Sequence, residues 1–228
     1  MIKLIHTLFY WANVSWMRAI LFFDTSRDVK GRENVPRNGP LILVSNHLNN
    51  ADPPIISSVT PRQISFLTKQ EWFKTPVVGT MFKLGGMIPV RRFAADLHAL
   101  RAAQKLLEDG GCLGMFAEGT RSKDGVMHQA EPGTALIALR TGAPIQPVAI
   151  WGTETVKLPK DMLLSRTKVY VRYGKPFTLG RPQRITRENV EDGTETIMKA
   201  VAALLPEKYR GYYADDKGAV RKVGTGTD

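Results

Sequence analysis

The sequence predicts an α/β fold in which a mainly parallel sheet is covered by helices on both faces. Short, apolar and β-branched runs alternate along the chain with longer segments that have the apolar periodicity of helices. Helical connections between strands are typical of parallel strand order, which buries the sheet on both faces. The 228 residues, 43% of them hydrophobic, suffice for one such domain. No internal repeat or long linker divides the sequence.

Six runs are predicted to form strands because they are short, apolar and bounded by turn residues. They lie at residues 41–45, 63–68, 87–90, 112–117, 144–150 and 167–173. Three segments have helical periodicity, and two of them end in glycine, which commonly terminates helices. These helices are expected at residues 93–109, 133–141 and 187–205. A further helix is expected to open at Asp52-Pro53, with Asp52 as its N-cap.

The N-terminal segment, residues 1–23, is rich in apolar and aromatic side chains but is interrupted by Lys3, His6 and Arg18. It lacks the uninterrupted apolar core of a signal peptide, and Arg18 lies inside its best spanning candidate. On a helix its polar and large apolar residues separate, which predicts an amphipathic, membrane-associating helix. The alternative is a helix packed on the protein's own core. The expected organisation is therefore a membrane-associating helix, the α/β domain and a flexible tail: residues 1–25, 26–214 and 215–228.

The chain is strongly basic, with 32 lysines and arginines against 21 acidic residues and a formal net charge of +11. Such a balance favours a polyanionic partner: nucleic acid, an anionic membrane or a phosphorylated ligand. Nucleic acid is disfavoured because no helix-turn-helix, aromatic platform or zinc knuckle motif accompanies the charge. The basic stretch 156–187 would face anionic lipid, the phosphates of CoA, an acidic carrier protein, or only solvent. The single cysteine, Cys112, excludes an internal disulfide and fits a reducing, cytoplasmic setting.

Polar side chains follow three of the predicted strands, and the carboxyl ends of parallel strands are where α/β proteins gather their ligands. The three strand ends carry a histidine, an arginine pair and a Glu/Arg turn: His47, residues 91–92 and residues 118–121. Arginine offers a fork of donors that matches phosphate oxygens, so Arg92 and Arg121 would clamp one phosphate. Each arginine alone would be an ordinary surface charge. Together the three strand ends indicate a site that binds a phosphate and moves a proton.

His47 and Asp52 lie five residues apart, in the sequence S-N-H-L-N-N-A-D-P-P. On a regular helix these side chains would point about 140° apart, so only a turn brings them together. A carboxylate at the start of the next helix would accept from backbone N–H groups and from the imidazole at once. That contact would fix the histidine tautomer and stabilise the imidazolium formed when the ring takes a proton. Taken alone, His47 would be an ordinary loop residue and Asp52 an ordinary helix cap.

The sequence offers no serine or cysteine nucleophile for this pair. It contains no G-x-S-x-G motif, and Cys112 falls inside an apolar strand pattern, where a buried, inert thiol is expected. A histidine–carboxylate pair without its own nucleophile indicates that the substrate supplies one, such as a hydroxyl group. The four histidines have no metal-ligand spacing, and neither a P-loop nor a dinucleotide-binding fingerprint is present. No metal or cofactor is therefore expected.

Four segments together resemble the motifs of the glycerolipid acyltransferases, specifically the branch that acts on 1-acylglycerol 3-phosphate. N-H-L-N-N-A-D resembles that family's N-H-x-x-x-x-D motif, and G-M-I-P-V-R-R is similar to its second motif, which ends in a phosphate-binding arginine. F-A-E-G-T-R-S and A-P-I-Q-P-V are similar to the third and fourth. The four lie in the family's order at residues 46–52, 86–92, 116–122 and 143–148. Two departures are Asn49, where the motif usually has serine, and Ala117, where it usually has proline.

The resemblance implies direct acyl transfer without a cofactor. His47 would deprotonate the free hydroxyl of lysophosphatidic acid, which attacks the thioester of acyl-CoA or acyl-carrier protein, while Asp52 holds His47. The glycerol-phosphate end of the acceptor would be bound by Arg92, Glu118, Gly119, Thr120 and Arg121. The resemblance also implies association with a membrane. Together with the basic charge, this predicts a peripheral or monotopic protein on the anionic, cytoplasmic face of the cell membrane. The alternatives are another acceptor, such as glycerol 3-phosphate, a lyso-ornithine lipid or a glycolipid, or a basic protein that binds membranes without catalysis.

Overall fold

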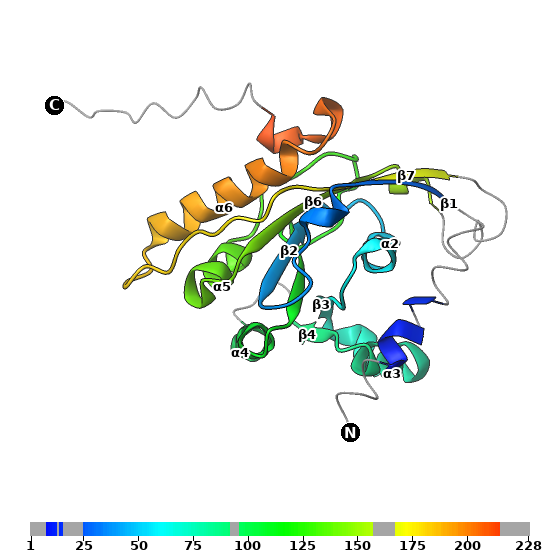
Figure 1. Cartoon of the computed structure of the whole chain (residues 1–228), viewed down its shortest axis with the longest axis horizontal. Helices are drawn as coiled ribbons and strands as arrows, with labels where there is room; N and C mark the ends of the chain where they lie inside the picture. The colour runs from blue at the N-terminus through cyan, green and yellow to red at the C-terminus, as the bar shows by residue number, and fades with distance from the viewer. Residues whose placement is uncertain (1–7, 13, 16–24, 92–95, 157–166, 215–228) are drawn as a thin grey trace.

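The computed structural model describes residues 8–12, 14–15, 25–91, 96–156 and 167–214. They form one seven-stranded sheet in the order β1-β7-β6-β2-β5-β3-β4 (Figure 1). The strands are β1 (Thr25–Lys30), β2 (Leu41–Ser45), β3 (Ser65–Lys69), β4 (Ile88–Val90), β5 (Cys112–Phe116), β6 (Ile145–Trp151) and β7 (Thr167–Tyr173). Strands β2 to β6 run parallel, whereas β7 runs antiparallel to β6 and carries β1 parallel to itself. The expected α/β fold with a mainly parallel sheet is confirmed.

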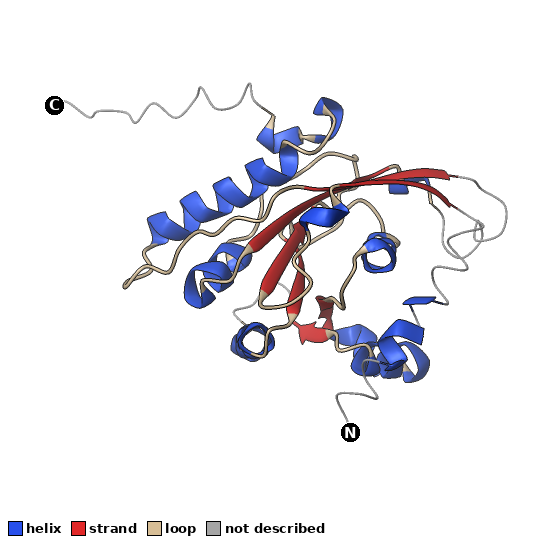
Figure 2. Cartoon of the chain, in the orientation of Figure 1, coloured by secondary structure: helices blue, strands red, loops and turns tan. Residues whose placement is uncertain are grey.

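The part of the chain described between β1 and residue 214 has five α-helices (Figure 2); four of them connect strands, and the last follows the final strand. They are α2 (Asp52–Val59), α3 (Pro76–Leu84), α4 (Leu97–Glu108), α5 (Gly133–Thr141) and α6 (Arg187–Ala202). Short 3₁₀ helices lie between these elements and after α6: η1 (Arg32–Asn34), η2 (Gln70–Lys74), η3 (Thr153–Thr155), η4 (Glu207–Tyr209) and η5 (Gly211–Tyr213). Helices α4, α5 and α6 pack on one face of the sheet and α2 packs on the other.

Strand β2 lies at the centre of the sheet, and all its residues are buried. Because successive side chains of a strand point to opposite faces, Ile42 and Val44 pack with the helices α4 to α6, while Leu41 and Leu43 pack with α2. A strand covered on both faces needs a continuous apolar run, which explains the sequence LILVS. The turn that follows β2 is therefore held by the most buried element of the molecule.

Gly114 in β5 provides space for an aromatic side chain beside this centre. A side chain at this position would collide with Phe66 of β3 and with Ile64. The absence of a Cβ lets the Phe66 ring lie against Phe116, with ring centroids 5.4 Å apart. Phe116 ends β5 and pairs with Ser45 at the end of β2. The glycine thus brings an aromatic stack to the edge of the sheet where β2 ends.

Two elements were not predicted from the sequence, and the predicted N-cap of one helix was wrong. Strand β1 (TSRDVK) and helix α3 (PVVGTMFKL) were not predicted, because the first is a polar edge strand and the second is short and apolar. Asp52 is not the N-cap of α2: Ala51 holds that position, and the helix begins at Asp52 itself. The physical reason is that the Asp52 carboxylate reaches back to the preceding turn and does not bond to the first helical N–H groups.

The N-terminal residues 8–12 and 14–15 are helical, and this helix contacts the domain. Tyr10 and Val14 are buried, and the Tyr10 hydroxyl accepts a hydrogen bond from the backbone N–H of Ile64 at 3.1 Å. Leu8, by contrast, is 62% exposed. The other N-terminal residues and the expected tail 215–228 lie outside the described residues, so the membrane-associating helix stays a prediction. Among the residues that are described, no helix is long and apolar enough to cross a membrane.

Candidate active site

The chain leaves the sheet directly after β2, where the side chain of Asn46 makes hydrogen bonds with the backbone of β6. The Asn46 amide donates from Nδ2 to the carbonyl of Ile150 at 2.8 Å, and its Oδ1 accepts from the N–H of Ile150 at 2.9 Å. These bonds replace the pair that a further β2 residue would make with β6. The chain is thereby freed to leave the sheet at His47.

His47 and Asp52 meet across this turn. The Nδ1 of His47 lies 2.9 Å from Oδ2 of Asp52, and both residues are buried, with 7% and 0% of their surface exposed. The same oxygen accepts from the backbone N–H groups of Leu48 and Asn49, each at 2.7 Å. Because the carboxylate acts only as an acceptor here, Nδ1 is the donor and Nε2 carries the lone pair of the ring. The turn therefore presents a histidine with a fixed tautomer.

An aromatic ring fixes the plane of the His47 imidazole. Phe116 stacks on it, with ring centroids 4.1 Å apart and an angle of 22° between the planes. Phe66 in turn stacks on Phe116. The imidazole is thus held at Nδ1 by a hydrogen bond and across its face by an aromatic stack.

Glu118, two residues after β5, holds the backbone of the same turn. Its Oε1 accepts from the N–H of His47 at 3.2 Å, and its Oε2 accepts from the N–H of His128 at 2.9 Å. The carbonyl of His47 in turn accepts from the N–H of Ser122 at 2.8 Å. Burial raises the pKa of Glu118 to about 7, and the two backbone donors only partly offset it. Both backbone groups of His47 are therefore tied to the loop that follows β5.

This loop has a polar network of its own. Asp124 Oδ1 accepts from the Ser122 hydroxyl at 2.9 Å and lies 2.8 Å from Nε2 of His128. Hydrogen bonds from His128 and Ser122 lower the pKa of Asp124 to about 2. The network links Ser122, whose backbone N–H donates to the His47 carbonyl, with His128, whose backbone N–H donates to Glu118.

The structure brings together some of the residues that the sequence singled out. His47, Asp52 and Glu118 converge on one turn, and Gly119 follows at a φ of 70°, which favours glycine. Thr120 and Arg121 are exposed on the turn beside them. Arg92 lies outside the described residues. Its neighbour Arg91 is exposed and lies 3.6 Å from a carboxylate oxygen of Asp96.

Sequence reasoning missed the structural roles of Asn46, Phe116, Ser122 and His128. An amide directly after a buried strand and an aromatic residue at the end of the neighbouring strand were visible as patterns. Their function depends on the register of β2 with β5 and β6, which pairs Ser45 with Phe116 and with Val148. Ser122 and His128 contact His47 and Glu118 through backbone N–H groups, which leave no signal in the residue type.

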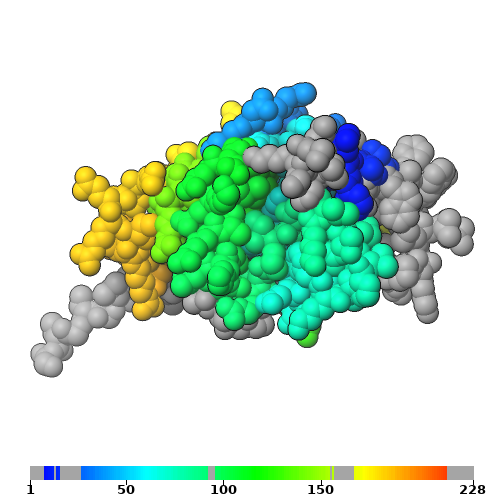
Figure 3. All heavy atoms as spheres, turned by 90° about the horizontal axis from the view of Figure 1, so that it is seen from below, coloured from blue at the N-terminus to red at the C-terminus, as the bar shows by residue number. Residues whose placement is uncertain are grey.

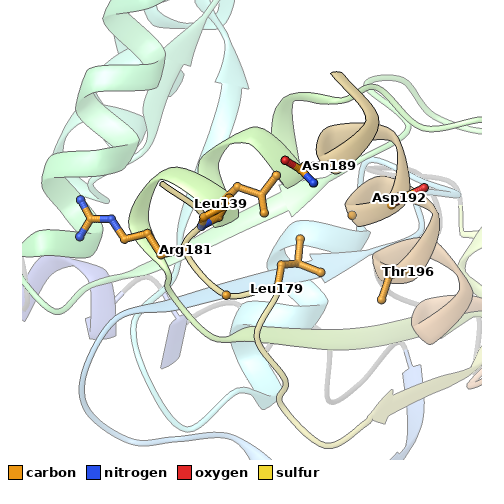
Figure 4. Close-up of a pocket in the computed structure, with 9 residues that line it drawn as sticks. Leu139, Leu179, Arg181, Asn189, Asp192 and Thr196 are labelled. Carbon is orange, nitrogen blue, oxygen red and sulfur yellow. The ribbon is translucent and has the colours of Figure 1, made fainter. Parts of the chain in front are cut away.

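The described residues contain no group of three side chains suited to hold a metal ion. One groove of about 430 Å³ lies between α5, α6 and residues 179–182 (Figure 4), and it is lined by Leu139, Leu179, Arg181, Asn189, Asp192 and Thr196, among others. Leu139 lies near the C-terminal end of α5. Just beyond that helix, the carbonyl of Pro144 accepts a hydrogen bond from the N–H of Ile42, near the start of β2. The groove is therefore at the opposite edge of the sheet from His47.

The chain is similar to a family of proteins and to individual enzymes. The model of the acyltransferase family matches residues 26–151. A chloroplastic 1-acyl-sn-glycerol-3-phosphate acyltransferase of Brassica napus is 32% identical over 171 residues, which cover 73% of this chain and 48% of that protein. The enzyme of the same name from Borreliella burgdorferi is 29% identical over 168 residues, which cover 71% and 66%. The chain thus spans about half the length of the first of these relatives and about two thirds of the second.

A solved structure is similar over most of the chain. It is the crystal structure of PlsC, the 1-acyl-sn-glycerophosphate acyltransferase of Thermotoga maritima. The two chains are 28% identical and superpose with a TM-score of 0.64, covering 89% of this chain and 79% of the other.

The pKa of Glu118 predicts a pH dependence of stability. Folded Glu118 keeps its proton up to about pH 7, whereas the unfolded chain loses it near 4.5. The unfolded state therefore binds fewer protons in this range, so this group makes the free energy of unfolding fall as pH rises from about 4.5 to about 7. The full effect is on the order of 3 kcal/mol. Glu118→Gln cannot titrate, so its stability relative to the wild type should rise over this range in urea titrations. A difference that does not change with pH would contradict the assignment.

Proposed function

The chain belongs to the acyltransferase family, and we propose that it transfers an acyl chain to the free hydroxyl of 1-acylglycerol 3-phosphate, giving phosphatidic acid. The donor would be a thioester, acyl-CoA or acyl-carrier protein. The observation that carries this proposal is the buried contact between His47 and Asp52, which leaves Nε2 of the histidine as a base. The names of the relatives support the choice of acceptor.

In the proposed reaction His47 acts as a general base. Its Nε2 takes the hydroxyl proton while the acceptor oxygen attacks the thioester carbonyl carbon. As the new C–O bond forms and the C–S bond breaks, the departing thiolate accepts that proton from the imidazolium. Asp52 stabilises that imidazolium through Nδ1. Assistance of this kind typically contributes about 10²–10⁴-fold to a rate.

The position of the only cysteine supports direct transfer without an acyl-enzyme. Cys112 is 2% exposed and pairs with Leu41 at the start of β2, at the opposite edge of the sheet from His47. Burial raises the pKa of its thiol to about 12, so the reactive thiolate is scarce at neutral pH. The acceptor hydroxyl is then the nucleophile.

The contacts of Glu118 favour a positioning role over the acceptor-binding role expected from the sequence. Both of its carboxylate oxygens already accept from backbone N–H groups, and one of these belongs to His47. The exposed Arg121 on the same turn is free to reach a ligand in solvent or at a surface. We therefore assign the acceptor phosphate to Arg121 and Arg92, whose guanidinium groups match its geometry.

The test of the base is acyl transfer to lysophosphatidic acid, with acyl-CoA and acyl-carrier protein as alternative donors. His47→Ala should lower kcat by at least about 10²-fold, and Asp52→Asn should also lower it because the tautomer is no longer fixed. His98→Ala, which removes an exposed histidine of α4, is the matched control and should retain wild-type turnover. Full activity in a folded His47→Ala protein would refute the mechanism.

The phosphate assignment predicts a selective effect on the acceptor. Arg121→Ala should raise the KM for lysophosphatidic acid about tenfold or more, since a charged hydrogen-bonded contact is lost, and should leave the donor KM unchanged. Arg140→Ala, an exposed arginine at the end of α5, controls for the loss of a surface charge. Equal changes in both KM values would show that Arg121 does not read the acceptor phosphate.

A further inference from the structure

The segment between β3 and β4 is apolar but barely buried. It comprises η2 and α3, residues 70–84, and is called here the η2–α3 hairpin. Its only buried residue is Gly79. Val77 is 73% exposed and Trp72 is 49% exposed, although α3 carries a single charged side chain. A helix that is apolar on most of its circumference is normally covered by protein or by lipid.

The hairpin is nevertheless well formed. Phe73 of η2 packs edge-on against Phe82 of α3, with ring centroids 5.8 Å apart. The two elements approach so closely at Gly79 that a Cβ there would collide with the Phe73 backbone. Trp72 and Val77 are thus exposed on a folded unit whose two phenylalanines pack against each other.

The hairpin projects from the edge of the sheet that carries the candidate site. It begins directly after Lys69, where β3 ends, and β3 runs parallel to β5, which in turn runs parallel to β2. The view of Figure 3 shows the hairpin on the same face as the N-terminal helical residues 8–12, and the two lie side by side in Figure 1 as well. Leu8 of that helix is also exposed. Apolar surface therefore gathers beside the edge where His47 lies.

Lysines surround the apolar residues of the hairpin. Lys69, Lys74 and Lys83 are exposed, and the one acidic residue within residues 69–84, Glu71, lies 3.9 Å from Lys69 in a solvent-exposed pair. Exposed tryptophan with flanking lysines is the composition of a surface that sits at the headgroup boundary of an anionic bilayer. Protein–protein interfaces, by contrast, are depleted in lysine.

We propose that the η2–α3 hairpin docks on an anionic bilayer, with Trp72 and Val77 in the interface and the three lysines against the headgroups. This inference rests on the proposed function, because a lyso-lipid acceptor and its two-chain product both partition into membranes. Docking through this surface would hold the edge with His47 and Arg121 next to the bilayer, so that the acceptor reaches the base without crossing water.

The first test places a probe on the surface. Cys112 is 2% exposed, so in a Val77→Cys variant the introduced thiol is the one that an environment-sensitive fluorophore labels. Vesicles of equimolar phosphatidylglycerol and phosphatidylcholine with a spin-labelled lipid should shift its emission to the blue and quench it. The control is Tyr212→Cys, because Tyr212 is 40% exposed and belongs to the segment 207–213, whose orange-red ribbon lies far from α3 in Figure 1. An unquenched probe at residue 77, or equal quenching at both positions, would overturn the proposal.

The second test separates docking from catalysis. A Trp72→Ser, Val77→Ser double variant should bind these vesicles about tenfold or more weakly, and Lys74→Glu should lose about fivefold or more. The double variant should acylate vesicle-embedded lysophosphatidic acid poorly but a short-chain, water-soluble analogue as fast as the wild type. Loss of self-association in sedimentation, with vesicle binding unchanged, would identify a subunit interface and overturn the proposal. A wild-type protein that binds vesicles but acylates neither acceptor would refute the proposed function alone.

Discussion

The hydrogen bond between His47 and Asp52 is the contact on which the arrangement of the site depends. One carboxylate oxygen accepts three donors, and two of these are backbone N–H groups of the turn itself. The aspartate therefore shapes the turn and orients the imidazole at the same time. This is also why α2 begins at Asp52 without a side-chain cap: the carboxylate that would cap the helix is used by the turn.

Two carboxylates support the same histidine and differ in their surroundings. Asp52 contacts the ring, whereas Glu118 contacts only backbone N–H groups and has a pKa raised to about 7 by burial. The loop after β5 is coupled to the backbone of His47 through Glu118 and through the N–H of Ser122. A charge that sits on Glu118 only above about pH 7 gives this loop a titratable connection to the site, independent of the acid–base chemistry of the imidazole.

The sequence predicted the elements whose pattern is dictated by burial. The apolar run of β2 and the helix α5 were predicted with the observed bounds, because continuous apolar residues and a terminal glycine are strong local signals. Strand β1 was missed because it is polar and its pairing with β7 joins residues distant in the sequence, and helix α3 was missed because it is short and apolar. Within the site, the spacing of His47 and Asp52 required a turn. The stacking of His47 on Phe116 and the hydrogen bond from the His47 N–H to Glu118 depend on the register of β2 with β5. No local sequence pattern specifies that register.

We propose that Asp52 fixes His47 with its proton on Nδ1 and its lone pair on Nε2. Nitrogen-15 NMR of protein labelled in its histidines measures this directly, and the His47→Ala spectrum identifies the resonances that belong to residue 47. For the neutral ring we expect a protonated Nδ1 and an unprotonated Nε2, and a change in tautomer populations in Asp52→Asn. A His47 ring with its proton on Nε2 in the wild-type protein would contradict it.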